Sequence, residues 1–183
     1  MKFSLWAGIP VVAFCALVAV AAQARVESVG SASATFDAAG PGGLNIRGKT
    51  SDLTASEASG KVKVVVALGK LDTGINLRDQ HMRNNYLEVG KYPNATVEVK
   101  RDELKFPSKK ADSSGHVPGS MTLHGVTKPV TLDYSARLRG DKVAVDGSTT
   151  IDMRDYGINV PRYLGVGVDP NVSINVSFKV VDH

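Results

Sequence analysis

Apolar and polar residues alternate with a period of two along much of this chain, most clearly near its C-terminus. Within residues 171–181 the apolar positions are Val172, Ile174, Val176, Phe178 and Val180, and the positions between them are polar or charged. Successive side chains of a β-strand point to opposite faces, so this pattern is typical of a strand with one buried face and one wet face. The segment therefore predicts a long strand at the edge of a hydrophobic core.

The same alternation recurs upstream. Residues 129–139 and 143–151 alternate on either side of a Gly-Asp-Lys turn, which predicts a β-hairpin. Shorter candidate strands, each bounded by Gly, Pro, Asn or Ser clusters, are residues 31–37, 44–50, 61–68, 94–101, 102–106 and 116–124. About eight strands joined by short connections predict an all-β, antiparallel fold, either a closed barrel or a sandwich.

One segment loses the alternation. Residues 77–88 instead place apolar side chains four positions apart, the spacing of a helix face. Asn76 is a candidate N-cap, and Asp79 would be the third helical residue, where a carboxylate meets unpaired backbone N–H groups. Gly90 and Pro93 follow the segment. We expect one short helix across an end of the sheet.

The N-terminus resembles a secretory signal peptide. Lys2 supplies the positive end, residues 5–20 are almost entirely apolar, and Ala22-Gln23-Ala24 forms a small-x-small cleavage site. Pro10 interrupts the apolar stretch, which is short for a membrane-spanning helix of about 20 residues. We therefore expect residues 1–24 to be removed, leaving a mature domain of residues 25–183 in the periplasm, with secretion as the alternative and no stable membrane anchor.

Composition excludes several classes of protein. Cleavage would remove Cys15, the single Cys of the chain, so neither a disulfide framework nor a Cys-based zinc site is expected. The formal charge of +4 falls to +3 when Lys2 is lost, and the remaining charges are dispersed. A nucleic-acid partner is not expected.

Motifs for catalysis or metal binding are weak. Asp72-Thr73-Gly74 matches the aspartic-protease triplet, but one copy would require a homodimer, and Asp and Gly are ordinary turn residues. The four His residues lack metal-ligand spacing, and the chain has no nucleophile elbow, P-loop or dinucleotide fingerprint. We expect a protein that is not an enzyme and needs neither metal nor cofactor.

Three ordered motifs resemble the YceI-like domain of exported bacterial proteins. These are DTGINLRDQHMRNNYLEVGKYPNATVEV (residues 72–99), MTLHGVTKPVTLDY (121–134) and MRDYGI (153–158). Two features depart from the family pattern: residues 36–44 lack the usual His residues, and Tyr156 replaces the commoner Phe. A buried tyrosine hydroxyl needs a hydrogen-bond partner.

The resemblance implies an eight-stranded antiparallel barrel of lipocalin type, with an apolar tunnel in which family members hold isoprenoids such as polyprenyl phosphates or quinones. Small aliphatic residues dominate the expected inward positions, which favours free volume inside, although side chains fill some small barrels completely. The residues expected to line the tunnel are Val64, Val66, Val97, Val99, Leu123, Leu132, Tyr134, Val145, Ile174, Val176 and Phe178.

An anionic head group would need cationic partners. Arginine offers a planar set of donors that suits phosphate, and the candidates are Arg78, Arg83, Lys128, Arg154 and Arg162. The sequence thus predicts a carrier of an isoprenoid or similar amphiphile. The alternative is a stress-related interaction protein with a filled barrel and no ligand, and a homodimer is compatible with either.

Overall fold

The computed structural model describes residues 26–109, 111–163 and 166–182. The predicted signal peptide lies outside these residues. Among the residues described, no helix has the length and hydrophobicity needed to cross a bilayer.

The strands are β1 (Val26–Ser28), β2 (Ser33–Ala39), β3 (Asn45–Thr50), β4 (Leu53–Ala58), β5 (Lys61–Ala67), β6 (Asn94–Lys100), β7 (Ser113–Leu123), β8 (Val126–Arg139), β9 (Lys142–Asp152), β10 (Arg162–Tyr163), β11 (Val166–Gly167) and β12 (Asn171–Asp182). The helical segments are η1 (Pro41–Gly43), η2 (Leu68–Lys70), α1 (Asn76–His81), η3 (Met82–Tyr86), η4 (Arg101–Glu103) and η5 (Met153–Tyr156).

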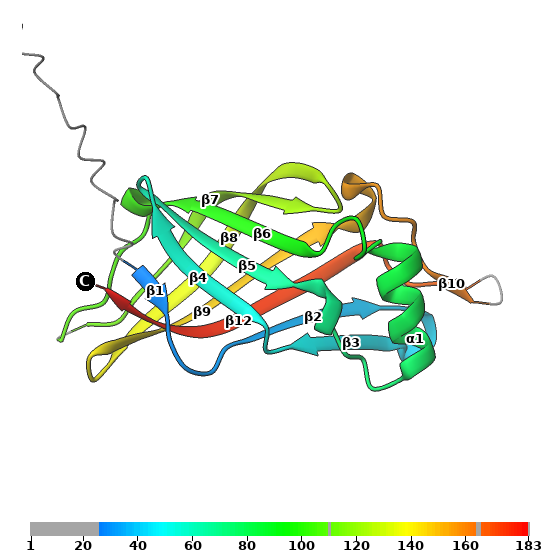
Figure 1. Ribbon diagram of the computed structural model, residues 1–183, viewed down its shortest axis with the longest axis horizontal. Coiled ribbons are helices and arrows are strands. Elements are labelled where there is room, and N and C mark those ends of the chain that lie inside the picture. Colours follow the sequence, from blue (N-terminus) through cyan, green and yellow to red (C-terminus); the bar gives the residue numbers. More distant parts are fainter. Residues whose placement is uncertain (1–25, 110, 164–165, 183) are drawn as a thin grey trace, which may run out of the picture.

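The strands close into a barrel (Figure 1). The hydrogen-bonded order is β1-β4-β5-β6-β7-β8-β9-β12, and β12 pairs back with β1, which completes an eight-stranded ring. Every pairing in the ring is antiparallel. This confirms the expected all-β, eight-stranded antiparallel barrel. Closure through β1 pairs the edges of β4 and β12 that an open sheet would expose, whereas β3 pairs with β2 alone among the described strands.

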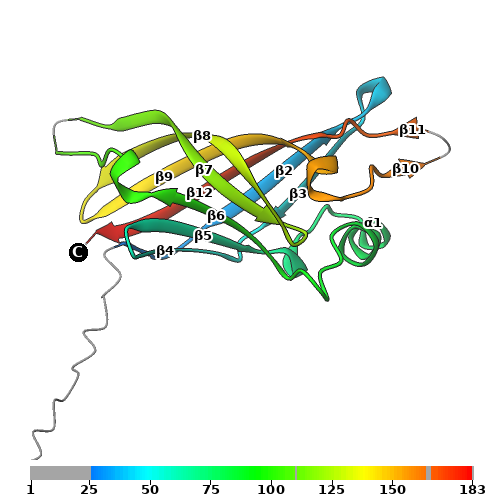
Figure 2. The same cartoon turned by 90° about the horizontal axis from the view of Figure 1, so that it is seen from above.

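At two neighbouring positions around the barrel, two short strands follow one another along the barrel axis: β1 and β2 at one position, β4 and β3 at the next. β1 and β2 pair with successive stretches of one edge of β12, through Val26↔Asp182 and Val172↔Ala38. β2 in turn pairs with β3, and β1 with β4. The hairpin β2–β3 therefore extends the wall beyond β1 and β4 toward α1, as Figure 2 shows.

Most predicted strands are present, but two errors have clear causes. β4 was not predicted, because its inward positions include Ala55 and Glu57, which interrupt the apolar pattern. The predicted strand over 102–106 is wrong: it begins in the 3-10 turn η4 and continues as a loop. Leu104 closes that turn with a backbone hydrogen bond to Arg101 O (3.2 Å), so the alternation there belongs to a loop that crosses the barrel end.

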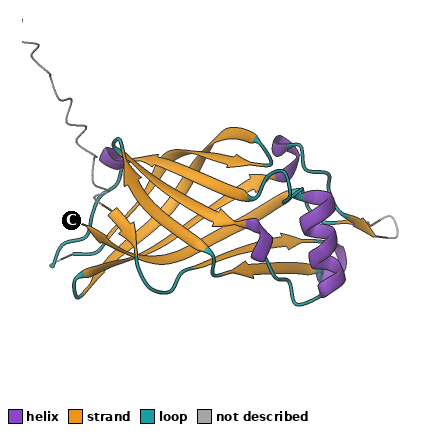
Figure 3. Ribbon diagram, in the orientation of Figure 1, coloured by secondary structure: helices purple, strands orange, loops and turns teal. Residues whose placement is uncertain are grey.

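The predicted helix is confirmed as a shorter element. α1 ends at His81 and continues as the wider turn η3, in which Leu87 N donates to Met82 O (2.9 Å). Asn76 is not the cap, since Ile75 occupies the N-cap position without a side-chain hydrogen bond and Asn76 is the first helical residue. Figure 3 shows α1 across one end of the barrel and η4 at the opposite end.

The core is divided between the two ends of the barrel. One buried cluster contains Leu68, Leu123 and Tyr156, with Met82 and Leu87 of the helical segment packed against it. The other contains Val26, Val143 and Phe178, with Phe106 packed against it. The first cluster therefore anchors η3, which continues from α1, and the second anchors the loop of residues 101–106.

A tight turn joins β7 to β8. Leu123 pairs with Val126, so His124 and Gly125 form a two-residue hairpin loop in which both have positive φ (51° and 75°). Glycine is required at the second position, because a Cβ there would lie 2.5 Å from the Tyr92 ring. His124 packs edge-on against that ring, with the ring centroids 4.6 Å apart. The turn is thus fixed to the segment that follows η3.

Candidate functional site

The barrel encloses a cavity of about 930 Å³. Its wall is built from the inward positions of β2, β5, β6, β7, β8, β9 and β12, and these side chains are almost all aliphatic. Many are small, including Ala34, Ala95, Ala136 and Gly147, and this leaves space that larger residues would fill. The alternative prediction of a barrel filled by its own side chains does not match this interior.

All eleven predicted tunnel residues line this cavity. They reach it from β5, β6, β7, β8, β9 and β12, so they surround the space on most sides. Their contact with a ligand stays a prediction. Sequence reasoning missed other lining residues, among them Phe36, Met82 and Met121, of which Phe36 and Met121 lie within predicted strands.

One end of the cavity is covered by residues 101–106, which we call the floor. Tyr134 contributes its inward hydroxyl, which accepts a hydrogen bond from Lys105 N (2.8 Å) and so fixes the floor to β8. Arg101 Nε lies 3.2 Å from Glu57 Oε2, and the Arg101 guanidinium stacks on the Phe106 ring at 3.4 Å. β4 directs the Glu57 side chain into the barrel, where it is 5% exposed. The ion pair with Arg101 therefore compensates the buried negative charge of the Glu57 carboxylate.

The other end carries the opening, which we call the mouth. It is defined by the residues that both line the cavity and are exposed at the α1 end: Leu44, Ile75, Leu77, His81 and Arg162. Leu44 directly precedes β3, Ile75 directly precedes α1, Leu77 and His81 lie in α1, and Arg162 begins β10. The mouth is therefore formed mainly by turn and helix residues, and Leu44 is the one member that belongs to a predicted strand, over residues 44–50.

A network of hydrogen bonds fixes α1 beside the mouth. Asp79 Oδ1 accepts from Thr73 N (2.9 Å) and Thr73 Oγ1 (2.6 Å), which ties the helix to the preceding turn. Asp72 Oδ1 accepts from Gly74 N (2.7 Å), and the Asp72 backbone pairs with Lys49 of β3. The DTG triplet is thus a structural turn that connects the barrel wall to the helix.

The Asp79 carboxyl is buried yet held in its charged form. Burial alone would raise its pKa, but the two hydrogen bonds from Thr73, with the positive charge of Arg83, outweigh that effect and the pKa is lowered. Asp79 is 4% exposed, so protonating it would weaken a connection inside the structure. This group therefore makes the helix attachment sensitive to acid.

Of the predicted head-group residues, Arg78 and Arg162 line the cavity at the mouth. Arg78 is held in place by Thr73, because its Nε donates to Thr73 Oγ1 and its Nη2 to Thr73 O, both at 2.7 Å. Its Nη1 makes no hydrogen bond with any residue the structure describes. Arg78 is thus a positioned cation beside the opening.

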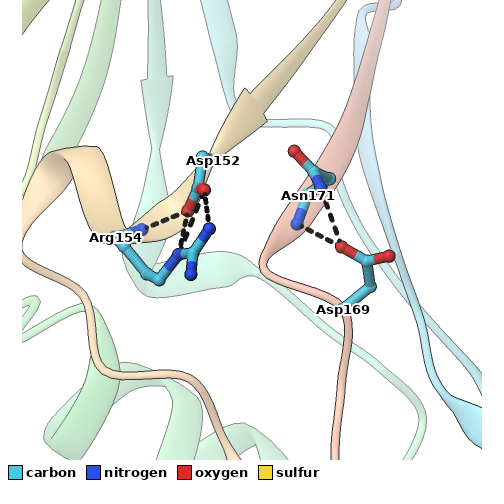
Figure 4. A network of polar contacts seen from close by, with 4 residues as sticks. All are labelled: Asp152, Arg154, Asp169 and Asn171. Carbon is cyan, nitrogen blue, oxygen red and sulfur yellow. Dashed lines mark hydrogen bonds and ion pairs between the residues drawn. The ribbon is translucent and has the colours of Figure 1, made fainter.

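The other three predicted cations do not reach the cavity. Arg83 donates to Gly69 O (3.1 Å), and Lys128 is exposed on the outer surface of β8. Arg154 forms an ion pair with Asp152, whose Oδ2 lies 2.5 Å from Arg154 Nη2 (Figure 4). The sequence could not exclude these residues, since their direction depends on how β8, η3 and η5 sit in the closed barrel.

The Arg154 pair belongs to the junction of β9 and β12. The Asp152 carboxylate also accepts from Arg154 N (2.9 Å), and hydrogen bonding to Arg154 lowers the pKa of Asp152. On the facing segment, Asp169 Oδ1 accepts from Asn171 N (2.8 Å) and Asn171 Nδ2 (2.9 Å), as Figure 4 shows. These contacts shape two turns, and the charge of Arg154 is balanced locally.

Asp72, His81 and His124 would be the candidates for a catalytic constellation, and no hydrogen bond joins any two of them in the part of the chain that the structure describes. His124 Nδ1 lies 3.0 Å from Tyr156 O and its Nε2 lies 3.3 Å from Glu88 Oε2, while Asp72 is engaged in its own turn. Among the described residues, no three His, Cys, Asp or Glu side chains are grouped to hold a metal ion. Tyr156 is 2% exposed, and its hydroxyl has no hydrogen-bond partner among the residues that the structure describes.

The fold and its interior define a class of protein, an eight-stranded antiparallel barrel around an apolar cavity. The family model described as "YceI-like domain" matches residues 23–180, and the chain belongs to this family. A UPF0312 protein of Vibrio parahaemolyticus is 32% identical over 180 residues, which cover 87% of this chain and 90% of the relative. A UPF0312 protein of Pseudomonas paraeruginosa is 36% identical over 107 residues, so in that alignment the chain spans about half (53%) of the relative's length.

Solved structures share the fold at low sequence identity. A polyisoprenoid binding domain from Saccharophagus degradans superposes with a TM-score of 0.72 at 18% identity, covering 88% of this chain and all of that one. Burkholderia cenocepacia BcnA superposes with a TM-score of 0.66 at 14% identity, covering 81% of this chain and 95% of that one. These similarities support the barrel architecture.

Proposed function

We propose that this protein is a non-enzymatic periplasmic carrier that holds one isoprenoid or other lipid-like amphiphile inside its barrel. The observation that carries the proposal is the apolar cavity of about 930 Å³, which opens at a mouth beside Arg78 and Arg162. A related fold is described as a polyisoprenoid binding domain, which supports this class of ligand. Export to the periplasm rests on the signal sequence expected in residues 1–24.

The cavity volume sets the size of the guest. At about 30 Å³ for each water-sized atom, the space holds roughly 30 non-hydrogen atoms. Each methylene group removed from water stabilises the complex by about 0.8 kcal/mol, so a tail of about 20 carbons would gain ~16 kcal/mol before the cost of ordering it. Such a molecule needs no covalent link to remain bound.

The cavity also orients the guest. The wall between the floor and the mouth is aliphatic, while cationic Arg78 and Arg162 lie at the mouth. An amphiphile would therefore place its tail toward the floor and its polar end beside the two arginines. An anionic or strongly polar head group fits the donors of Arg78, which Thr73 already holds in position.

The direct test is to identify what the protein carries. The mature protein, expressed in a bacterium with its own signal sequence, is purified from the periplasm, extracted with organic solvent and analysed by mass spectrometry. We expect an apolar compound at a molar ratio near one. Repeated extracts without any such compound would contradict the proposal.

A matched pair of variants tests the site itself. Val176 faces the cavity, whereas the next residue of β12, Ser177, is exposed on the outer surface. We expect Val176→Trp to fold and to lose most of the extracted compound, because the indole fills the space of the tail. Ser177→Trp should retain the compound. Equal lipid content in the two variants would place the ligand elsewhere.

A further inference from the structure

The mouth gathers the exposed large apolar side chains of the described chain. These are Leu44, Ile75 and Leu77, with exposed fractions of 44%, 53% and 62%. All three also line the cavity, so the apolar interior continues onto the outer surface at this point. Single exposed apolar residues are common on proteins, but a group confined to the rim of an apolar cavity indicates an interaction surface.

Two arginines accompany this apolar rim. Arg78 and Arg162 line the same end of the cavity, and no acidic side chain among the described residues lines the mouth. The acidic residue that does line the cavity, Asp133, lies on β8 and is paired with His116. The rim therefore combines apolar side chains with positive charge, a pattern suited to an anionic lipid surface.

We propose that the mouth docks onto anionic phospholipid bilayers, with Leu44, Ile75 and Leu77 inserted among the head groups and the arginines against the phosphates. This inference rests on the proposed carrier function, because docking lets a tail move between bilayer and cavity without crossing water. Three partly exposed aliphatic side chains offer far less area than the ~800 Å² per partner of a standard protein interface, which argues against a second copy. A few inserted side chains with nearby cations are sufficient for reversible membrane binding.

Vesicle flotation tests the docking surface. The mature protein is mixed with vesicles of phosphatidylcholine alone or of phosphatidylcholine with phosphatidylglycerol, and the fraction that floats is measured at low and high salt. We expect binding to the vesicles that contain phosphatidylglycerol, weakened by salt. Absence of binding to those vesicles would overturn the proposal.

Variants assign the binding to the mouth. Ile75→Ser combined with Leu77→Ser should reduce partitioning roughly tenfold or more, because two inserted side chains are lost. Arg162→Gln should reduce it about fivefold, whereas Arg139→Gln, the same change at the opposite end of the barrel, should have little effect. Unchanged partitioning of the Ser double variant, with an unchanged melting temperature, would refute docking through the mouth.

Two further measurements separate the alternatives. Sedimentation of the protein without vesicles detects self-association, and a dimer that the double Ser variant abolishes would assign the surface to a second copy and overturn the docking proposal. Solvent extracts of the same preparations report on the carrier function independently. If the protein carries lipid but does not bind vesicles, the docking proposal alone is refuted. If it binds vesicles but carries no lipid, the carrier proposal is refuted.

Discussion

Gly48 is the residue whose replacement tests the packing of the cavity wall most sharply. It lies on β3 directly opposite Phe36 of β2, and the Phe36 ring lies over the space where a side chain would stand. A Cβ added at Gly48 would be 2.1 Å from Phe36 Cε1 and 2.6 Å from Cζ, so Gly48→Ala must displace the ring. Phe36 lines the cavity, and the free space beside the ring is the cavity itself.

The displacement has two expected consequences. Overpacking of this kind costs about 1–3 kcal/mol, which corresponds to a fall in melting temperature of roughly 3–10 °C for a domain of this size. The displaced ring should also occupy part of the tail space, so the extracted lipid should decrease. Thermal unfolding followed by circular dichroism, with mass spectrometry of the same preparation, measures both effects.

Gly90→Ala provides the matched control. No atom lies within 4 Å of a Cβ at Gly90, so the same added methyl group should leave stability within about 1 kcal/mol of the wild type, with any change favourable. A melting temperature of Gly48→Ala within a degree of the Gly90→Ala value would refute the reasoning, because it would mean that the Phe36 ring moves at no cost.

Three other changes have defined outcomes. Tyr156→Phe should raise the free energy of unfolding, measured in urea, by about 1 kcal/mol, since it removes a buried hydroxyl that has no partner among the described residues; a loss of stability would show that the hydroxyl is satisfied. Asp79→Ala should cost about 1–3 kcal/mol at neutral pH, because Thr73 loses its acceptor. The pKa of Asp79 is lower in the folded than in the unfolded protein, so its contribution to the free energy of unfolding is complete above the unfolded-state pKa. That contribution declines as pH falls through the folded-state pKa. Free energies of unfolding of the wild type and Asp79→Ala, measured in urea at several pH values, should therefore converge in acid. Arg101→Met should cost roughly 3 kcal/mol by urea unfolding, because it leaves the buried Glu57 carboxylate without this partner, and a change below about 1 kcal/mol would contradict that role for the ion pair.

Much of the barrel could be predicted because its strands obey a simple geometric rule. Residues 171–181 and the hairpin of β8 and β9 alternate with a period of two, and each of these predicted strands is present. β4 could not be recognised in the same way, because the barrel accommodates Ala55 and a charged Glu57 at its inward positions. The compensating Arg101 lies 44 residues away in sequence, so no local pattern connects the pair.

The cavity wall and the mouth differ in how far sequence can predict them. Inward positions on strands follow from alternation, which is why residues such as Val176 and Leu132 were placed on the wall. Ile75 and Leu77 lie before and at the start of a helix, where side-chain direction depends on how segments meet in three dimensions. Leu44 was included in the predicted strand over 44–50, but β3 begins one residue later, so Leu44 lies in the turn before it. The same dependence explains why Arg78 faces the opening while Lys128 lies on the outer surface.

The floor over residues 101–106 has a consequence for the proposed carrier function. Leu104 and Phe106 line the cavity at this end, so a guest held as we propose would leave through the mouth by which it entered, with its polar end first. A carrier of this kind would not serve as a continuous conduit between two membranes. It would instead work as a shuttle that moves one molecule per trip, so transport would saturate with the number of protein copies and would depend on their diffusion.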